Sequence, residues 1–200
     1  MSHDLGVVEV VRKTGEEPFY QNGQAFGFNV LSFWQWSASD LLSNATRGIL
    51  AEFLVARALE STVKARAEWD AYDAVTARGT RVEVKSAAYL QSWHQEKHAR
   101  ITFDTRSTRA WDATTNLLSE ERKRQADVYV FCLLDHKDQV TVDPLDLAQW
   151  KFFVVSTKRL NAELGEQKSL SLKRLQKLRL EPTYYGSLKE AVERAVEKSL

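Results

Sequence analysis

The sequence is poor in residues that crosslink or interrupt a chain. Among its 200 residues are one cysteine, Cys132, three prolines and eight glycines. A single cysteine excludes a disulfide within the chain, and with it the class of small disulfide-stabilised secreted domains. No Pro/Gly-rich linker, internal repeat or low-complexity segment divides the sequence. We therefore expect one domain over residues 1–200.

Long apolar segments are missing as well. No run approaches the roughly 20 residues that cross a bilayer, and the start MSHDLGVVEVVRK lacks the basic and apolar stretches of a signal peptide. The sequence therefore predicts a cytoplasmic protein with no membrane partner. A hydrophobic fraction of 44% and a charged fraction of 28% are typical of a globular domain rather than a disordered chain.

Net charge gives no indication of a nucleic-acid partner, because it is only +1. A nucleic-acid surface must therefore come from local clusters of basic residues. Such clusters occur at 122–124 (Arg-Lys-Arg), at Lys158-Arg159, and at Lys173-Arg174 with Lys177 and Arg179. A solvated helix face is the simpler interpretation of each cluster.

Six tryptophans are many for a chain of this length. We expect most of them in the core, whereas Trp93 and Trp111 stand in polar stretches and are candidates for a binding surface.

Hydrophobic patterning predicts an α/β fold with a mixed central sheet flanked by helices. Its core is expected over about residues 44–135, with an N-terminal extension at 1–43 and a C-terminal strand and helices at 136–200. In the extension we expect a short strand at Gly6–Arg12 and an aromatic segment, Phe26–Trp36, packed on the core. The remaining expected elements are a helix capped by Ser39 or Asn44 and running to Glu60; strands at Trp69–Val75, Arg81–Ala87, Arg100–Phe103, Ala126–Leu134 and Phe152–Ser156; and helices at Leu90–Lys97, Asn116–Gln125, Ser156–Glu163, Ser171–Leu178 and Ser187–Lys198.

The first candidate site residue is Glu52, the only charged residue from Gly48 to Ala56. From Ile49 to Leu59 the predicted helix is apolar on nearly every face, so we expect it to be buried on most sides. A carboxylate there is costly unless a metal, a lysine or a metal-bound water accompanies it.

The second and third candidates, Asp73 and Glu83, stand on the two arms of a predicted hairpin. If Thr76–Thr80 form its loop, Val75 pairs with Arg81 and Asp73 lies opposite Glu83. Paired side chains share a face with Cβ atoms about 5 Å apart, so the two carboxylates repel each other without a cation. Mg²⁺ or Mn²⁺, which prefer oxygen ligands, would relieve that repulsion.

Lys85 completes the candidate site. It follows Glu83 by two residues on the same strand, so both side chains point to one face. An ammonium there can stabilise charge on a phosphate or position a water nucleophile. A solvated set of hairpin ion pairs is the structural alternative for these charges.

The spacing of these residues resembles the PD-(D/E)XK nuclease superfamily, which has the restriction-endonuclease-like fold with an αβββαβ core. The resemblance covers about residues 44–135 and is carried by Glu52 on a helix, Asp73, and Glu83-Val84-Lys85. The segment WDAYDAVTARGTRVEVKSAAYLQSW is similar to a bacterial branch of that superfamily. Tyr72 stands where the motif's name has proline, and Asp70 is a rival for the role of Asp73.

This resemblance implies a Mg²⁺-dependent (or Mn²⁺-dependent) nuclease in restriction, repair or mobile-element processing, with DNA as the first choice of substrate and RNA as the second. It implies that Glu52, Asp73, Glu83 and the backbone carbonyl of Val84 ligate the metal and that Lys85 supports the attacking water. Gln91 is a further candidate, with simple capping as its alternative. We expect flanking phosphates to be held by Arg106, Arg109, Arg122, Lys123 and Arg124. Because such folds often dimerise to cut both strands, a homodimer is compatible with the resemblance.

Two alternatives of other classes remain. One is a non-catalytic nucleic-acid-binding or complex-forming module with the same fold, and the other is an interaction protein whose hairpin acids form salt bridges.

Two further residue patterns do not predict a site. His94 and His98 have the spacing of some zinc ligands but lack a third ligand, so an exposed polar helix is the better interpretation. Cys132 falls in a buried strand, where we expect inert packing.

Overall fold

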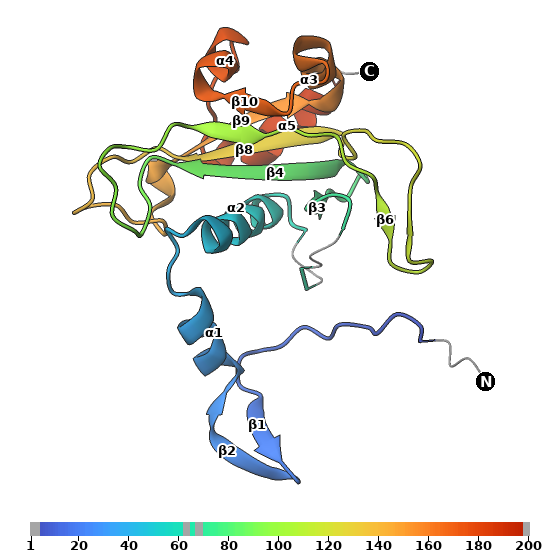
Figure 1. Cartoon of the computed structure of the whole chain (residues 1–200), viewed down its shortest axis with the longest axis vertical. Coiled ribbons are helices and arrows are strands. Elements are labelled where there is room, and N and C mark those ends of the chain that lie inside the picture. Colours follow the sequence, from blue (N-terminus) through green and yellow to red (C-terminus); the bar gives the residue numbers. More distant parts are fainter. Residues whose placement is uncertain (1–4, 62–64, 67–69, 198–200) are drawn as a thin grey trace.

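A mixed four-stranded sheet is the centre of the computed structural model, which describes residues 5–61, 65–66 and 70–197. The strand order is β3-β4-β8-β9, in which β4 and β8 are parallel and the two outer pairs are antiparallel (Figure 1). The strands are β3 (Ala74–Val75), β4 (Arg81–Ala88), β8 (Val128–Leu134) and β9 (Trp150–Ser156). This arrangement confirms the predicted α/β class with a mixed central sheet. The strand expected from Trp69 is limited to its last two residues here, and Trp69 itself lies outside the described residues.

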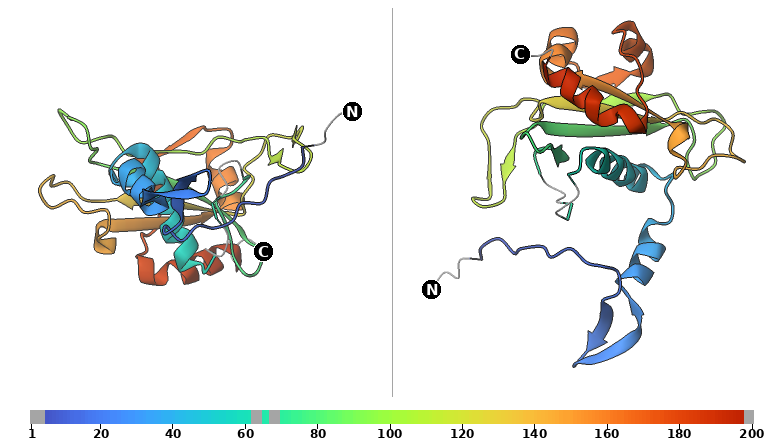
Figure 2. Two further views of the ribbon diagram at one scale, coloured as in Figure 1. Left: turned by 90° about the horizontal axis from the view of Figure 1, so that it is seen from below. Right: turned by 180° about the vertical axis from the view of Figure 1, so that it is seen from behind.

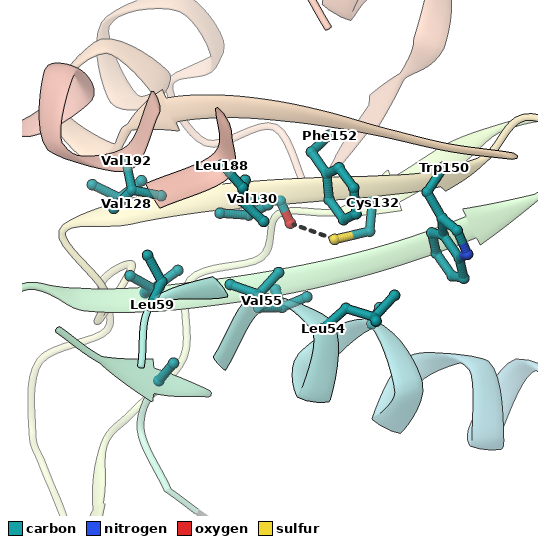
Figure 3. Close-up of a cluster of buried hydrophobic side chains, with 14 of the residues drawn as sticks. Leu54, Val55, Leu59, Val128, Val130, Cys132, Trp150, Phe152, Leu188 and Val192 are labelled. Atoms are coloured by element: carbon teal, nitrogen blue, oxygen red, sulfur yellow. Dashed lines mark hydrogen bonds between the residues drawn. The ribbon is translucent and has the colours of Figure 1, made fainter. Parts of the chain in front are cut away.

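Strand β8 is buried along its whole length, as its uninterrupted apolar sequence predicts. Its side chains alternate between two apolar layers, one on each face of the sheet. Cys132 lies in the same layer as Val130, where it is fully buried and its Sγ lies 3.8 Å from the Val130 carbonyl (Figure 3). Burial raises the pKa of the Cys132 thiol, so the expectation of inert packing is confirmed.

Helices cover both faces of the sheet. On one face α2 (Asn44–Ala58) and α5 (Leu188–Glu197) pack against the layer that contains Val130 and Trp150 (Figure 3). On the other face α3 (Thr157–Leu164) and α4 (Leu172–Lys177) pack against the layer that contains Phe131 and Phe153. Helices α3 and α4 form where helices were predicted, and Ser156 and Ser171 are their N-caps. Two short 3-10 turns, Leu147–Gln149 and Tyr185–Ser187, precede β9 and α5.

Helix α2 departs from the expectation in its burial. Ser43 caps it, one residue before the predicted Asn44, whereas Ser39 ends the preceding helix. Only one face of α2 packs on the sheet, and the opposite residues Ile49 and Phe53 are 48% and 50% exposed. The prediction that most of its sides are buried was therefore wrong, because only one layer of protein meets this helix.

The crossover from β4 to β8 is built from strands and loops. Its strands are β5 (Thr102–Asp104), which pairs with β10 (Ser169–Ser171), and the hairpin β6 (Trp111–Asp112) and β7 (Leu117–Leu118). The helices predicted at Leu90–Lys97 and Asn116–Gln125 do not form. In the first segment the Gln95 side chain accepts the backbone N–H of Gln91 at 2.7 Å. In the second segment Leu117 and Leu118 pair with β6 and Lys123 pairs with Thr108, so the backbone groups bond across strands instead of along a helix.

The N-terminal residues form a separate hairpin and helix that stand away from the central sheet (Figures 1 and 2). These elements are β1 (Pro18–Gln21), β2 (Gln24–Asn29) and α1 (Val30–Ala38), and none of the nine residues of α1 is buried. Residues Gly6–Arg12 form no strand. The expectation that Phe26–Trp36 packs on the core was wrong, because its aromatic rings contact one another and the facing strand: Phe28 lies 5.9 Å from Phe26 and 4.9 Å from Phe19 between ring centroids.

The tryptophans follow the same pattern. Of the five within the described residues, only Trp150 is buried, so the expectation of mostly core tryptophans was wrong. Trp93 and Trp111 are 54% and 36% exposed, as their polar surroundings predict. Within the described residues no helix is both long and apolar enough to cross a membrane.

Arg47 ties α2 to β4 from inside the protein, where it is only 2% exposed. Its guanidinium donates to the carbonyl of Leu42 at 2.7 Å, to Gln91 Oε1 at 3.1 Å and to Ser86 Oγ at 3.2 Å, and it also contacts Asn44 Oδ1. All these acceptors are neutral, so burial lowers the pKa of Arg47 without a carboxylate to oppose it.

We expect Arg47→Met to lower the free energy of unfolding by about 2–4 kcal/mol, because it removes a buried guanidinium and leaves several partly buried acceptors without a donor. Urea denaturation measures this loss. Arg78→Met, in the exposed β3–β4 turn, is the control and should change stability by less than about 0.5 kcal/mol. An Arg47 variant as stable as the control would contradict the structural role given to this side chain.

Candidate active site

The β3–β4 hairpin adopts the register that its sequence predicts. Val75 pairs with Arg81 and Ala74 with Val82. The turn is closed by the N–H of Thr76, which donates to the carbonyl of Thr80 at 2.9 Å. Gly79 has a φ of +81°, a left-handed conformation that favours glycine at this position.

Asp73 lies just before the first residue of β3, and beyond this point β3 no longer covers the outer edge of β4. Its backbone N–H donates to the carbonyl of Val82 at 2.9 Å, and its Oδ2 accepts the N–H of Val84 at 2.7 Å. The carboxylate thus replaces the hydrogen-bonding partner that a longer β3 would offer. Because the N–H and C=O of one strand residue point to the same side, the Val84 carbonyl also points toward this edge.

Glu83 and Lys85 form an ion pair on the next two outward-facing positions of β4. Their side chains are 18% and 30% exposed, so the pair is partly shielded from water. Val82 and Val84 alternate with them and are buried under α2, as the strand pattern predicts.

Electrostatics connect Asp73 to the other predicted residues. Burial, then repulsion from Glu83 and Glu52, raises the pKa of Asp73 to about 7, although Lys85 and the Val84 N–H oppose the shift. Burial acts to lower the pKa of Lys85, but the carboxylates of Glu83, Asp73 and Asp104 outweigh it and raise that pKa. Excess negative charge therefore surrounds a lysine that stays protonated at neutral pH.

Glu52 reaches the site from α2. Arg66 holds its carboxylate in a two-pronged ion pair, with Nη2 3.1 Å from Oε1 and Nε against Oε2. Glu52, Arg66 and Asp73 line one pocket of about 660 Å³. Glu83 and Lys85 are not among its lining residues, so the pocket brings together two of the four predicted side chains. Asp70 also lines this pocket, but it is Asp73, and not Asp70, whose carboxylate accepts the Val84 N–H.

The side chains of the site are of the types that bind a divalent cation, but in this structure they are not arranged around a common point. Within residues 5–61, 65–66 and 70–197, no three His, Cys, Asp or Glu side chains are gathered closely enough to hold a metal ion. Instead Arg66 and Lys85 neutralise Glu52 and Glu83. Carboxylate and carbonyl oxygens are nevertheless the ligands of a hard cation, and burial together with the nearby carboxylates of Glu83 and Glu52 raises the pKa of Asp73, so the ionised form lacks compensating positive charge.

Gln91 is engaged elsewhere. Its Oε1 accepts from the buried Arg47, and its Nε2 lies 3.4 Å from the carbonyl of Ala88. It therefore sits in the polar cluster under α2, and the contacts that it makes are structural. The His94 and His98 spacing carries no zinc site here, since the segment is not helical and the His98 Nε2 bonds to the carbonyl of Lys137 at 3.1 Å.

The predicted phosphate contacts differ in how available they are. Arg109 and Arg122 are exposed, Lys123 pairs with Glu121, and Arg106 forms a two-pronged ion pair with Asp104. Arg124 is only 8% exposed. Its guanidinium donates to the carbonyls of Thr105, Gly165 and Gln167 and to Asn161 Oδ1. These bonds connect separate segments inside the protein, and the burial of Arg124 does not support a phosphate contact at the surface.

Three residues near the site escaped the sequence analysis. Arg66 is paired with Glu52, Asp104 affects the pKa of Lys85, and Tyr129 is aligned with Glu83 in the sheet register. The Phe103-Asp104 step at the end of a predicted strand was the one usable signal, since polar groups often follow strand ends at sites.

Comparison with known proteins adds the decisive observation. Residues 29–174 match the bacteriophage T4 endonuclease IV family. The chain belongs to this family. No curated protein matches it. The match spans the hairpin, α2 and the sheet, so the matched residues include every predicted site residue, and membership in an endonuclease family supports a nuclease.

The acidity of Asp73 gives a direct test of this electrostatic description. We expect its carboxyl to titrate near pH 7 in carbon-detected NMR without divalent metal, and Glu83→Gln to lower that pKa. Because the folded protein keeps a proton that the unfolded chain loses above its ordinary value of 3.8, the free energy of unfolding should fall as the pH rises from about 4 to about 7. Asp73→Asn should lack this fall, and a normal Asp73 titration would contradict the description.

Proposed function

We propose that this protein is a Mg²⁺-dependent nuclease that hydrolyses phosphodiester bonds of DNA, and that its fold is a member of the PD-(D/E)XK superfamily. The observation that carries the proposal is the placement of Asp73, Glu83 and Lys85 at the free edge of β4, where two acids compete for positive charge. Membership in an endonuclease family supports the choice of substrate class.

The metal would be held by the carboxylates of Asp73, Glu83 and Glu52 together with the Val84 carbonyl. When bound, such an ion lowers the pKa of a water molecule and neutralises charge on the phosphate. Asp73 must give up its proton to act as a ligand, which its pKa of about 7 allows at neutral and alkaline pH.

The lysine and the arginine have separate roles in this proposal. Lys85 keeps its proton and stabilises the negative charge that develops on the phosphate oxygens during in-line attack. Its ion pair with Glu83 must loosen when Glu83 becomes a ligand, which frees the ammonium to turn toward the phosphate. Arg66 would be released from Glu52 in the same way and become available to a flanking phosphate.

The paired state of the acids favours one alternative, a nucleic-acid-binding module that keeps the fold without catalysis. In that case Lys85 and Arg66 would be permanent structural partners of Glu83 and Glu52, and metal would not compete for these acids. Cleavage and metal-binding measurements separate the two functions.

We expect the purified protein to cleave DNA in Mg²⁺ or Mn²⁺, and Lys85→Ala to lower the rate about 10²- to 10³-fold through lost stabilisation of the transition state. Plasmid and oligonucleotide cleavage measure this effect. The control is Lys168→Ala, which removes an exposed lysine distant from these residues in sequence and leaves the rate unchanged. Equal rates for wild type and Lys85→Ala would refute the assignment.

Metal binding should also appear without catalysis. Mg²⁺ or Mn²⁺ at about 100 times its dissociation constant raises the free energy of unfolding by about 2.7 kcal/mol, seen as a higher melting temperature. Asp73→Ala should abolish this stabilisation while the Lys168→Ala control keeps it. Metal stabilisation that survives Asp73→Ala would place the ion at another site.

A further inference from the structure

A second pocket, of about 390 Å³, lies against β9 at the opposite edge of the sheet from Asp73. Its apolar wall is formed by residues such as Val154, Leu180 and Pro182. Arg159 from α3, Arg179 after α4 and Arg194 from α5 surround it. Three arginines from three parts of the chain therefore face one cavity, whose only acidic lining residue among those described is Glu181.

The three arginines are exposed, and their guanidinium groups make few hydrogen bonds or ion pairs with the described residues. Arg159 donates one bond, from Nη2 to the carbonyl of Leu178 at 2.5 Å. Arg194 lies 3.5 Å from Glu190 in a surface pair on one helix, an interaction of small energy. In the described part of the chain, the Arg179 guanidinium makes no hydrogen bond or ion pair, and its backbone has a φ of +53°, which is unusual for arginine.

The sheet register relates this pocket to the candidate active site. Glu83 is aligned with Tyr129 of β8, which is aligned with Val155 of β9, a residue that lines the pocket. Adjacent strands lie about 4.8 Å apart, so β4 and β9 are about 10 Å apart along this row. Both sites lie toward the end of the sheet where β4 and β8 begin and β9 ends.

We propose that this arginine pocket binds a phosphate of the nucleic-acid backbone outside the bond that is cleaved, an inference that rests on the proposed nuclease function. Guanidinium groups bind phosphate oxygens through paired hydrogen bonds, and the apolar wall suits the adjoining sugar. The two sites lie at opposite edges of the sheet, so they are farther apart than the roughly 10 Å between β4 and β9. A bound oligonucleotide of ten nucleotides spans about 34 Å, at about 3.4 Å per nucleotide, and is long enough to engage both sites. An acidic protein segment is the competing occupant, and the experiment distinguishes it.

The test measures binding of a labelled DNA oligonucleotide by fluorescence anisotropy, as both duplex and single strand, in EDTA and at several salt concentrations. Asp73→Asn serves as the parent so that no cleavage occurs. Arg159→Gln/Arg179→Gln is compared with Lys168→Gln/Lys173→Gln, which removes the same charge from exposed positions outside the pocket. Arg179→Gln alone is included because, among the described residues, its guanidinium makes no hydrogen bond or ion pair that the substitution would break.

We expect the pocket variant to bind at least tenfold more weakly and to lower the slope of log affinity against log salt by about two, whereas the lysine control changes affinity less than twofold. Arg179→Gln alone should show about half of the slope change. Inorganic phosphate should compete with DNA at the parent's pocket only at millimolar concentration, as expected for a single phosphate.

Equal losses in the pocket and control variants, or none in either, would overturn the pocket assignment while leaving nuclease activity intact. Tighter binding of an acidic peptide than of DNA, lost in Arg179→Gln, would overturn it in favour of a protein partner. If the wild-type protein neither binds nor cleaves any oligonucleotide, the nuclease function itself fails, and that result is distinct from the others.

Discussion

The hydrogen bond from the Val84 N–H to the Asp73 carboxylate, 2.7 Å long, fixes the geometry of the candidate site. It exists because β3 has only two residues and leaves the edge of β4 open beyond Val82. A longer β3 would satisfy Val84 with a backbone carbonyl and turn Asp73 away. The short strand therefore places a carboxylate, a backbone carbonyl and the Glu83–Lys85 pair around one edge.

The rest of the fold supports this edge from behind. Strand β8 and the residues of β4 under α2 are buried, which makes β4 a rigid base for outward-facing charges. Arg47 adds a polar connection between α2 and β4 through Ser86, so that Glu52 on the same helix is held at a defined distance from β4. Rigidity of this kind matters because a site of like charges is unstable unless its supports prevent the acids from separating.

How far the sequence could predict this structure depends on the range over which each signal acts. The hairpin register, β8 and the positions of α3 and α4 were predictable, because alternation, a glycine turn and a continuous apolar run are local signals. The two false helices arose because Gln95 accepts a backbone N–H in the first segment and because residues of the second segment pair with strands, which composition does not reveal. The ion pair of Arg66 with Glu52 was missed, and Arg124 was expected at a phosphate although it bonds inside the protein, because the partner of each arginine is distant in sequence. The exposed aromatic residues of the N-terminal hairpin and α1 were misassigned to the core, because hydrophobicity alone does not show which part of the protein an apolar segment packs against.

The most direct test of the central claim is a crystal structure of the protein soaked in Mn²⁺, in which anomalous scattering locates the ion. The account predicts Mn²⁺ bound to the oxygens of Asp73 and Glu83 and to the Val84 carbonyl, with Lys85 displaced from Glu83, and no ion at this place in Asp73→Asn. An ion bound elsewhere, or a Glu83–Lys85 pair that persists with no anomalous peak beside Asp73 at saturating Mn²⁺, would contradict it.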